Sequence, residues 1–196
     1  VLLDQWLNHR SEQQVTLNDL ALRYLTAYGP ARPEDFASWA GVPLNQARAS
    51  WRALTNAFVE VEHGDRPIWI AKAHARWLDE LDSASDGAPI VNLIPAYDPY
   101  LLGYQHRELV VAPEYARRVH PGGGVLHNVL LVDGLALGIW RMTRRRGRLE
   151  VIVEPFVPLA PEIAPGPEAE VADLGRFYAT RAELHLLPPN SDPGIR

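Results

Sequence analysis

The chain of 196 residues contains no cysteine, so it has no disulfide framework, no thiolate metal site and no cysteine nucleophile. It also lacks any apolar run near the roughly 18 residues that a helix needs to cross a bilayer. Its beginning is interrupted at Asp4, His9 and Arg10, too early for a secretory signal. We therefore expect a cytoplasmic protein without membrane contact.

The chain also lacks the basic character of a general nucleic-acid coat. Its formal net charge is -5, with 19 basic and 24 acidic residues, whereas dedicated DNA-binding domains often have a pI above about 9. Any contact with DNA must therefore come from a local patch. Because the chain opens at Val1 and its only methionine is Met142, we expect that a segment of the natural protein precedes it.

The composition is that of a folded protein, with 47% hydrophobic and 22% charged residues. A chain of this length predicts two units, because domains usually contain about 100 to 150 residues. We find no internal repeat.

Three amphipathic segments and a hairpin predict the fold of the first half. Residues 17–28 repeat apolar side chains at helical spacing after Thr16, with Asp19 in the position of a capping-box partner. Pro33 opens a second short helix that ends at Gly41, and a third begins near Leu44. The alternating segments FVEVE and PIWIA then flank the turn HGDR. This order predicts a winged helix-turn-helix.

The second half changes to the period of a sheet. The segments VLHNVLLV, LALGIWRMT and LEVIVEPF are joined by Asp133-Gly134 and by the arginine-rich turn RRRGR, which predicts an antiparallel meander. ELVVA, at 108–112, predicts a further short strand. Residues 168–184 predict a final helix, and the remaining residues predict a frayed tail.

These patterns predict an α+β fold: a winged helix-turn-helix, then a small antiparallel β domain of partly open, barrel-like form, then a carboxy-terminal helix. The expected ranges are a lead-in or linker at 1–16, the winged-helix domain at 17–82, a linker at 83–93, the β domain at 94–160, and the helix with its tail at 161–196.

The outer face of the third predicted helix carries amide and guanidinium groups, which can read base edges in the major groove bidentately. These candidates are Asn45, Gln46, Arg48 and Arg52. The same face could equally be solvated or contact another protein. The hairpin that follows is acidic at Glu60, Glu62 and Asp65, which disfavours phosphate tracking. We therefore expect no strong sequence readout.

A cluster of arginines marks the turn between the last two predicted strands. Guanidinium pairs bidentately with phosphate oxygens, so this turn could contact a DNA backbone. The five candidates are Arg141, Arg144, Arg145, Arg146 and Arg148. A charged turn can also be simply solvated, although so much local positive charge on an acidic chain costs self-repulsion. Both interpretations stay open.

The segment PAYDPYLLGYQHRE brings tyrosines and titratable groups together. Asp98 with His106 or Glu108 could serve general acid-base chemistry, but we prefer a loop fixed by an aspartate turn and buried tyrosines. No histidines are spaced as an i, i+4 ligand pair, and carboxylates do not cluster around them, so we expect no metal site and no cofactor.

Three passages together resemble one family: LALRYLTAYGPARPEDFASWAGVPLNQAR, LIPAYDPYLLGYQHRELVV and VDGLALGIWRMTRRRGRLEVIVEPF. They are similar to the carboxy-terminal half of the winged-helix, crosslink-repair DNA glycosylases, in unbroken order over about residues 17 to 160. The resemblance implies winged helices stacked against a small barrel-like β domain, with a concave surface that holds double-stranded DNA in a bacterial repair protein.

In that family, a Gln-x-Gln motif of the amino-terminal winged helix carries hydrolysis of the N-glycosidic bond. This sequence contains no Gln-x-Gln, since Gln13 and Gln14 are adjacent, so the resemblance supplies no catalytic residue. It implies contact with an amino-terminal domain that is missing from this chain. Two family passages map onto positions that we expect to be architectural: Gly29, Pro30, Asp35, Phe36, Tyr97, Asp98, Leu101, Leu102, Gly103 and Tyr104.

Two functions from different classes follow. The first is the DNA-binding portion of a DNA-repair protein that resembles a glycosylase, acting through the arginine turn and the third helix. The alternative is a non-enzymatic winged-helix module that regulates transcription or binds a protein, which the net acidity favours. A hydrolase that uses Asp98 ranks below both.

Overall fold

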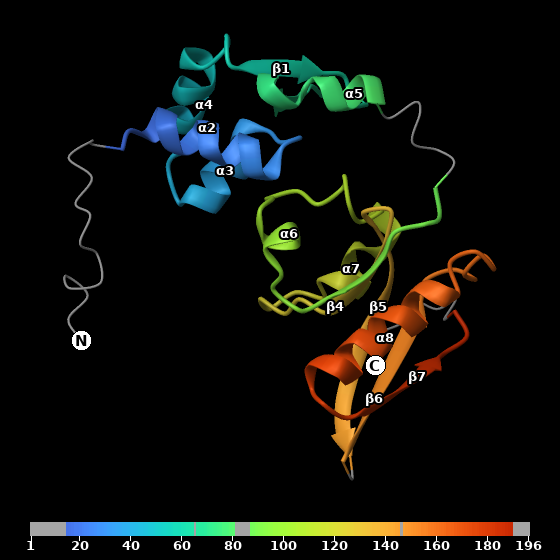
Figure 1. The fold of residues 1–196 in the computed structure, drawn as a ribbon. Helices are drawn as coiled ribbons and strands as arrows, with labels where there is room; N and C mark the ends of the chain where they lie inside the picture. The colour runs from blue at the N-terminus through green and yellow to red at the C-terminus, as the bar shows by residue number, and fades with distance from the viewer. Residues whose placement is uncertain (1–14, 65, 81–86, 146, 190–196) are drawn as a thin grey trace. The chain divides into compact units, whose positions relative to one another are not determined.

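The computed structural model describes residues 15–64, 66–80, 87–145 and 147–189. The chain forms two compact units, Val1–Asp82 and Ser83–Arg196, and each is described by itself (Figure 1). Most of the expected lead-in, the first part of the expected linker and the end of the expected tail lie outside the described residues. No helix within the described ranges combines the length and apolar character needed to cross a membrane.

Three helices open the first unit: α2 at Leu17–Tyr28, α3 at Pro33–Ala40 and α4 at Leu44–Ala53. The expected capping box at α2 is confirmed. The amide of Asp19 donates to Thr16 Oγ1 at 3.2 Å, and the amide of Thr16 donates to Asp19 Oδ2 at 2.9 Å. Gly41 ends α3 in the left-handed conformation, with φ 65°, so only three residues separate α3 from α4.

A two-stranded hairpin follows the helices. Strand β1 at Phe58–Val61 pairs antiparallel with β2 at Ile68–Ala71. Trp69 of β2 also exchanges two backbone hydrogen bonds with Ala31, each at 2.9 Å, so the segment between α2 and α3 joins the hairpin edge. A short 3-10 turn, η1 at Lys72–His74, then leads into α5 at Arg76–Glu80.

Aromatic side chains form the core of this unit. The ring of Phe36 lies 5.4 Å from that of Tyr24 and 5.8 Å from that of Trp51, and Trp51 meets Phe58 edge-on at 5.0 Å. All four side chains are buried. Because the chain of rings runs from α2 through α3 and α4 to β1, it fixes the helices against the hairpin and leaves the polar side of α4 outside.

The second unit contains one five-stranded sheet in the order β3-β4-β5-β6-β7. Its strands are β3 at Val91–Ile94, β4 at Asn128–Val132, β5 at Leu135–Arg145, β6 at Arg148–Pro155 and β7 at Arg181–Leu186. The predicted meander β4-β5-β6 is confirmed as antiparallel. Its first turn has positive φ at both Asp133 (49°) and Gly134 (80°), as a tight hairpin requires. The α+β class is thereby confirmed.

Four sequence predictions for this unit were wrong. The final helix, α8 at Pro165–Phe177, ends before residue 184, and the chain continues as β7, which pairs parallel with β6. The sheet is therefore mixed and not wholly antiparallel. Strand β3 begins inside the expected linker at 83–93. The expected strand at 108–112 is absent, since the amides of Val110 and Val111 both donate to Arg107 O in a tight turn.

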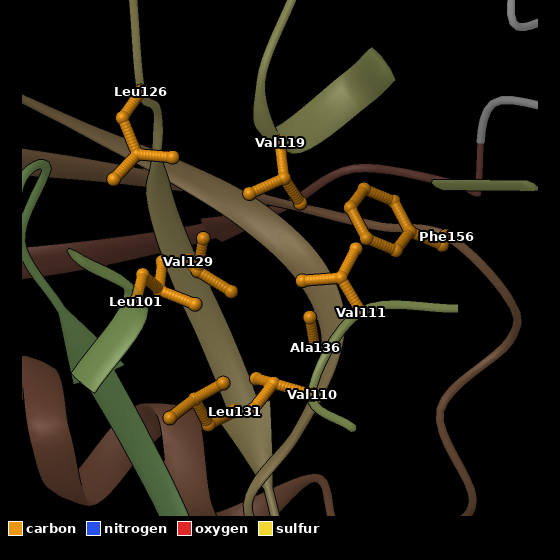
Figure 2. Packing of buried hydrophobic residues seen from close by; sticks show 9 residues of the cluster. All are labelled: Leu101, Val110, Val111, Val119, Leu126, Val129, Leu131, Ala136 and Phe156. Carbon is orange, nitrogen blue, oxygen red and sulfur yellow. The ribbon is translucent and has the colours of Figure 1, made fainter. Parts of the chain in front are cut away.

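Two apolar clusters cover the two faces of the sheet. On one face, α8 packs on a cluster that includes Trp140, Val153 and Val171. The other face is covered by the segment that contains α6 at Pro99–Leu102, η3 at Pro113–Tyr115 and α7 at Ala116–Val119. Figure 2 shows side chains of that segment converging on the sheet. The paired ends of β5 and β6 extend beyond α8 (Figure 1).

Several family-matched positions have plain structural roles. Asp35 is buried and its Oδ2 accepts from the amide of Arg32 at 2.9 Å, which caps α3. Asp98 Oδ1 accepts from the amide of Tyr100 at 2.8 Å, which caps α6. Leu101 is fully buried in the cluster of Figure 2. The two aspartates thus stabilise the amino-terminal ends of α3 and α6.

Candidate nucleic-acid interface

The outer side of α4 carries the four residues expected to face DNA: Asn45, Gln46, Arg48 and Arg52, all of them exposed. The opposite side of the helix is fixed by Ala47, Ser50 and Trp51, which are buried. This division follows from helical periodicity, because apolar and polar positions alternate at three and four residues. The structure therefore brings the predicted amide and guanidinium groups onto one open face of the first unit.

One of these cations is already engaged within the unit. Arg48 Nη2 lies 2.8 Å from Glu34 Oε1 of α3, and the two side chains are 54% and 28% exposed. A pair so open to solvent contributes little to stability, but it neutralises part of the positive charge on this face. The remaining full positive charge among the four residues is Arg52, in the last turn of α4.

The hairpin β5-β6 positions the predicted arginine cluster in the second unit. Pairing continues to Arg145 opposite Arg148, and Gly147 closes the turn with φ 78°. Arg146 lies outside the described residues. Successive side chains alternate between faces, so Arg144 shares the face of Trp140 and Met142 whereas Arg141 and Arg145 lie on the other.

A chain of ion pairs crosses the hairpin to the neighbouring strand. Arg145 Nε lies 4.0 Å from Glu150 Oε2, and Arg148 Nη2 lies 3.4 Å from Glu150 Oε1. Arg148 Nη1 lies 3.3 Å from Glu183 Oε2, and Arg181 Nε lies 3.2 Å from Glu183 Oε1. Three arginines thus share two carboxylates. These ion pairs connect arginines of three strands, and the two carboxylates reduce the formal charge of the group from +3 to +1.

Arg141 and Arg144 differ from their neighbours on the hairpin. Both are exposed, and neither forms a salt bridge with any residue that the structure describes. Their guanidiniums consequently keep their full charge for an external anion. The structure therefore divides the predicted cluster into two unpaired arginines, Arg141 and Arg144, and two that share carboxylates, Arg145 and Arg148.

Three members of this arrangement were not predicted from the sequence: Glu150, Glu183 and Arg181. The signal was present, because residues 181–186 alternate polar and apolar side chains with the period of a strand. The preceding helical pattern obscured it. The cross-strand partners themselves depend on register, which the linear sequence does not reveal.

A separate cavity of about 340 Å³ lies in the loop segment 105–120. Arg107, Arg117, His106, His120 and Glu108 line it, with His106 Nδ1 3.7 Å from Glu108 Oε1. Arg107 Nε donates to Leu101 O at 2.8 Å, and burial lowers the pKa of its guanidinium. The two arginines outnumber the single glutamate, so this wall suits an anion better than a metal ion.

The structure does not bring Asp98 to His106 and Glu108, as the hydrolase alternative would require. His106 and Glu108 do come together, but Asp98 is not part of the cavity wall and instead caps α6. No group of three or more potential metal ligands occurs within the described residues. The arrangement therefore gives no hydrolytic dyad with Asp98.

The chain is similar in sequence and in fold to known DNA glycosylases. A family model described as "DNA glycosylase AlkZ-like" matches residues 2–177. An interstrand DNA cross-link repair glycosylase of Streptomyces sahachiroi is 29% identical over 137 residues, which cover 68% of this chain and 35% of that protein. The solved structure of the Streptomyces sahachiroi DNA glycosylase AlkZ superposes with a TM-score of 0.74 at 24% identity, over 95% of this chain and 51% of that chain. The chain thus spans between a third and about half of the length of these relatives.

Proposed function

The chain belongs to the DNA glycosylase AlkZ-like family, and on this premise we propose that it is the DNA-binding portion of a bacterial DNA-repair protein. The partner in this proposal is double-stranded DNA, and a cytoplasmic location fits that partner. The observation that carries the proposal is the pair of exposed guanidiniums at Arg141 and Arg144, which have no carboxylate partner among the described residues of an acidic chain.

The proposal assigns the first unit to the winged helix-turn-helix type. In support, α3 and α4 are joined by a three-residue turn with a left-handed glycine, as in helix-turn-helix motifs. A β-hairpin follows, and its edge is bridged by Ala31. The exposed polar side of α4 would lie in the major groove, where Asn45 and Gln46 can hydrogen-bond to base edges.

The proposal assigns phosphate contact chiefly to the hairpin of the second unit. Arg141 and Arg144 would bind backbone oxygens directly, because no internal carboxylate competes for them. Arg145 and Arg148 would contribute less, because each shares its charge with Glu150 or Glu183. Such contacts position a protein on DNA without reading the sequence, in keeping with the small number of base-reading groups on α4.

No residue of this chain is assigned a role in bond cleavage. The relative is named as a cross-link repair glycosylase, and this chain aligns with 35% of it and contains no Gln-x-Gln. The proposal therefore assigns hydrolysis to an amino-terminal domain outside residues 1–196, which these two units would contact. In that arrangement they hold the duplex while the other domain acts on the lesion.

A salt titration of duplex binding tests the proposal. Each phosphate contact contributes about 0.9 to the slope of log affinity against log salt concentration. The double variant Arg141→Ala/Arg144→Ala should lower that slope by about 1.8, whereas Arg148→Ala should lower it less. The control is Arg23→Ala, an exposed arginine of α2 outside both the hairpin and the cavity. A double variant that binds with the wild-type slope excludes the hairpin from the interface.

The acidic hairpin of the first unit favours a second candidate function. Glu60 and Glu62 are exposed on or next to β1, where a DNA-tracking wing would be basic. A non-enzymatic module that binds protein through this edge accounts for them. Failure of the wild-type chain to bind duplex at low salt, combined with a dimer in sedimentation analysis, would favour this second function.

A further inference from the structure

An exposed aromatic pair closes the last turn of α8. Phe177 is 80% exposed, more than any other large hydrophobic side chain in the described ranges, and Tyr178 is 40% exposed. Their rings meet edge-to-face, with centroids 5.0 Å apart and planes at 89°. Tyr178 supports the Phe177 side chain on one side, and the 80% exposure of Phe177 leaves most of its ring open to solvent.

The turn that carries this pair is fixed against the arginine hairpin. Thr180 Oγ1 donates a hydrogen bond to the carbonyl of Gly147, and Arg181 stands opposite Arg148 in the register of β6 and β7. Helix α8 also approaches the turn closely, since a β-carbon added at Gly175 would lie 3.0 Å from Thr180 O. The aromatic pair and the hairpin tip therefore belong to one packed structure at the same end of the sheet.

The surroundings of the pair are cationic. The described residues 144, 145, 147–150 and 173–183 together contain five arginines and three acidic residues, although acidic residues outnumber basic ones in the whole chain. Exposed aromatic rings beside arginines are the combination by which proteins hold single-stranded nucleic acid, since the arginines follow phosphates while each base stacks on a ring. Apolar side chains at such positions can also wedge between base steps.

The size of the patch favours a base over a protein partner. One aromatic side chain buries about 150 to 250 Å², close to the area that a stacked base covers. A specific protein interface needs about 800 Å² on each side. Arg176 and its ion-pair partner Asp173 precede the pair, and the small side chain of Ala179 follows it, so the neighbours in sequence add little apolar area.

We propose that Phe177, supported by Tyr178, stacks on an unpaired or extruded DNA base while the neighbouring hairpin arginines hold the flanking phosphates. This inference rests on the proposed DNA-binding function and adds to it a preference for DNA with a disrupted stack. Stacking is tolerant of base identity, because every base offers a π face. The site therefore recognises local loss of pairing and not a sequence.

Binding of two matched duplexes tests this inference. One duplex is intact, and the other carries a single bulged base in the same sequence. Fluorescence anisotropy with the whole chain should show that Phe177→Ala weakens binding to the bulged duplex at least about fivefold, the lower end of the range for a lost stacking contact. Binding to the intact duplex should change less than twofold, with an unchanged salt slope. Phe177→Trp should retain the preference.

Two further variants separate stacking from nonspecific effects. Leu135→Ala removes an apolar side chain that is 53% exposed at the opposite end of β5, so it should leave both affinities unchanged. Phe177→Leu keeps an apolar side chain but removes the ring, so it should behave like Phe177→Ala. Thermal unfolding of each variant should match the wild type, because Phe177 makes few buried contacts.

The possible failures are distinguishable. Equal affinity of wild type and Phe177→Ala for the bulged duplex, equal losses on both duplexes, or full binding by Phe177→Leu would each overturn base stacking while leaving the proposed function intact. A wild-type chain that binds neither duplex at low salt would instead refute the proposed function itself.

Discussion

Glu150 offers the sharpest test of the charge arrangement on the hairpin. Its carboxylate is 22% exposed and lies within 4.0 Å of Arg145 and 3.4 Å of Arg148. The variant Glu150→Gln keeps the shape of the side chain and removes its charge. We expect two effects of opposite sign: a lower stability of the second unit and a higher affinity for duplex DNA.

Both magnitudes follow from the geometry. Exposed ion pairs each contribute about 0.2 to 1 kcal/mol, and the two arginines are 71% and 49% exposed, so the loss of stability should be about 1 kcal/mol or less. A phosphate on the far side of either guanidinium would lie roughly 7 Å from the carboxylate. In water, repulsion at that distance is about 0.6 kcal/mol, or nearly threefold in affinity. At physiological salt, screening reduces the gain to about 1.5-fold.

The assay is fluorescence anisotropy of a labelled duplex at low and at physiological salt, together with urea unfolding of the same preparations. Glu162→Gln is the matched control, because Glu162 is exposed just before α8, about 20 Å along that helix from the hairpin end. Weaker DNA binding by Glu150→Gln, or an equal gain in both variants, would refute the view that Glu150 restrains cations that face DNA.

Two predictions concern stability. Glu154→Gln should destabilise the second unit by about 2 kcal/mol in urea unfolding. The reason is that Arg118, 2.7 Å from Glu154 and stacked at 4.4 Å on Phe156, would lose this ion pair while only 12% exposed. A cost below about 0.5 kcal/mol would mean that the pair behaves as a surface pair. In α2, the hydrogen bonds from Thr16 lower the pKa of Asp19. The ionised Asp19 carboxylate therefore stabilises the fold above the ordinary carboxyl pKa, and this stabilisation is lost as the pH falls through the lowered pKa. The difference in melting temperature between wild type and Asp19→Asn should accordingly shrink between pH 7 and pH 3. A constant difference would contradict this assignment.

Short-range features were predictable because near neighbours in the sequence determine them. The capping box at Thr16 and Asp19 depends on residues three positions apart, and the turn at Asp133-Gly134 depends on two residues that tolerate positive φ. The polar side of α4 likewise follows from helical period alone. The arginine cluster at 141–148 was also visible locally, as a run of positive charge at a predicted turn between two strands.

The prediction failed where a pattern was locally compatible with two structures. Residues 178–184 continue the helical spacing of α8 but also alternate like a strand. The open edge of β6 decides between them, because six residues of β7 pair with it in parallel and bury Ala182 and Leu184 partly against α8. Helix propensity differs by less than 1 kcal/mol per residue among ordinary residues, so such tertiary pairing overrides it.

The sequence by itself determined the first three helices, the meander, the location of the positive charge and, through three passages, the family. Only the tertiary structure decided which of those charges remain available. Glu34 lies 14 residues from Arg48, and Glu183 lies 35 residues from Arg148, so register and packing alone bring each pair within 3.3 Å. Whether two charges form an ion pair depends on their distance in space, and a local sequence pattern does not reveal the distance between segments that meet only in the fold.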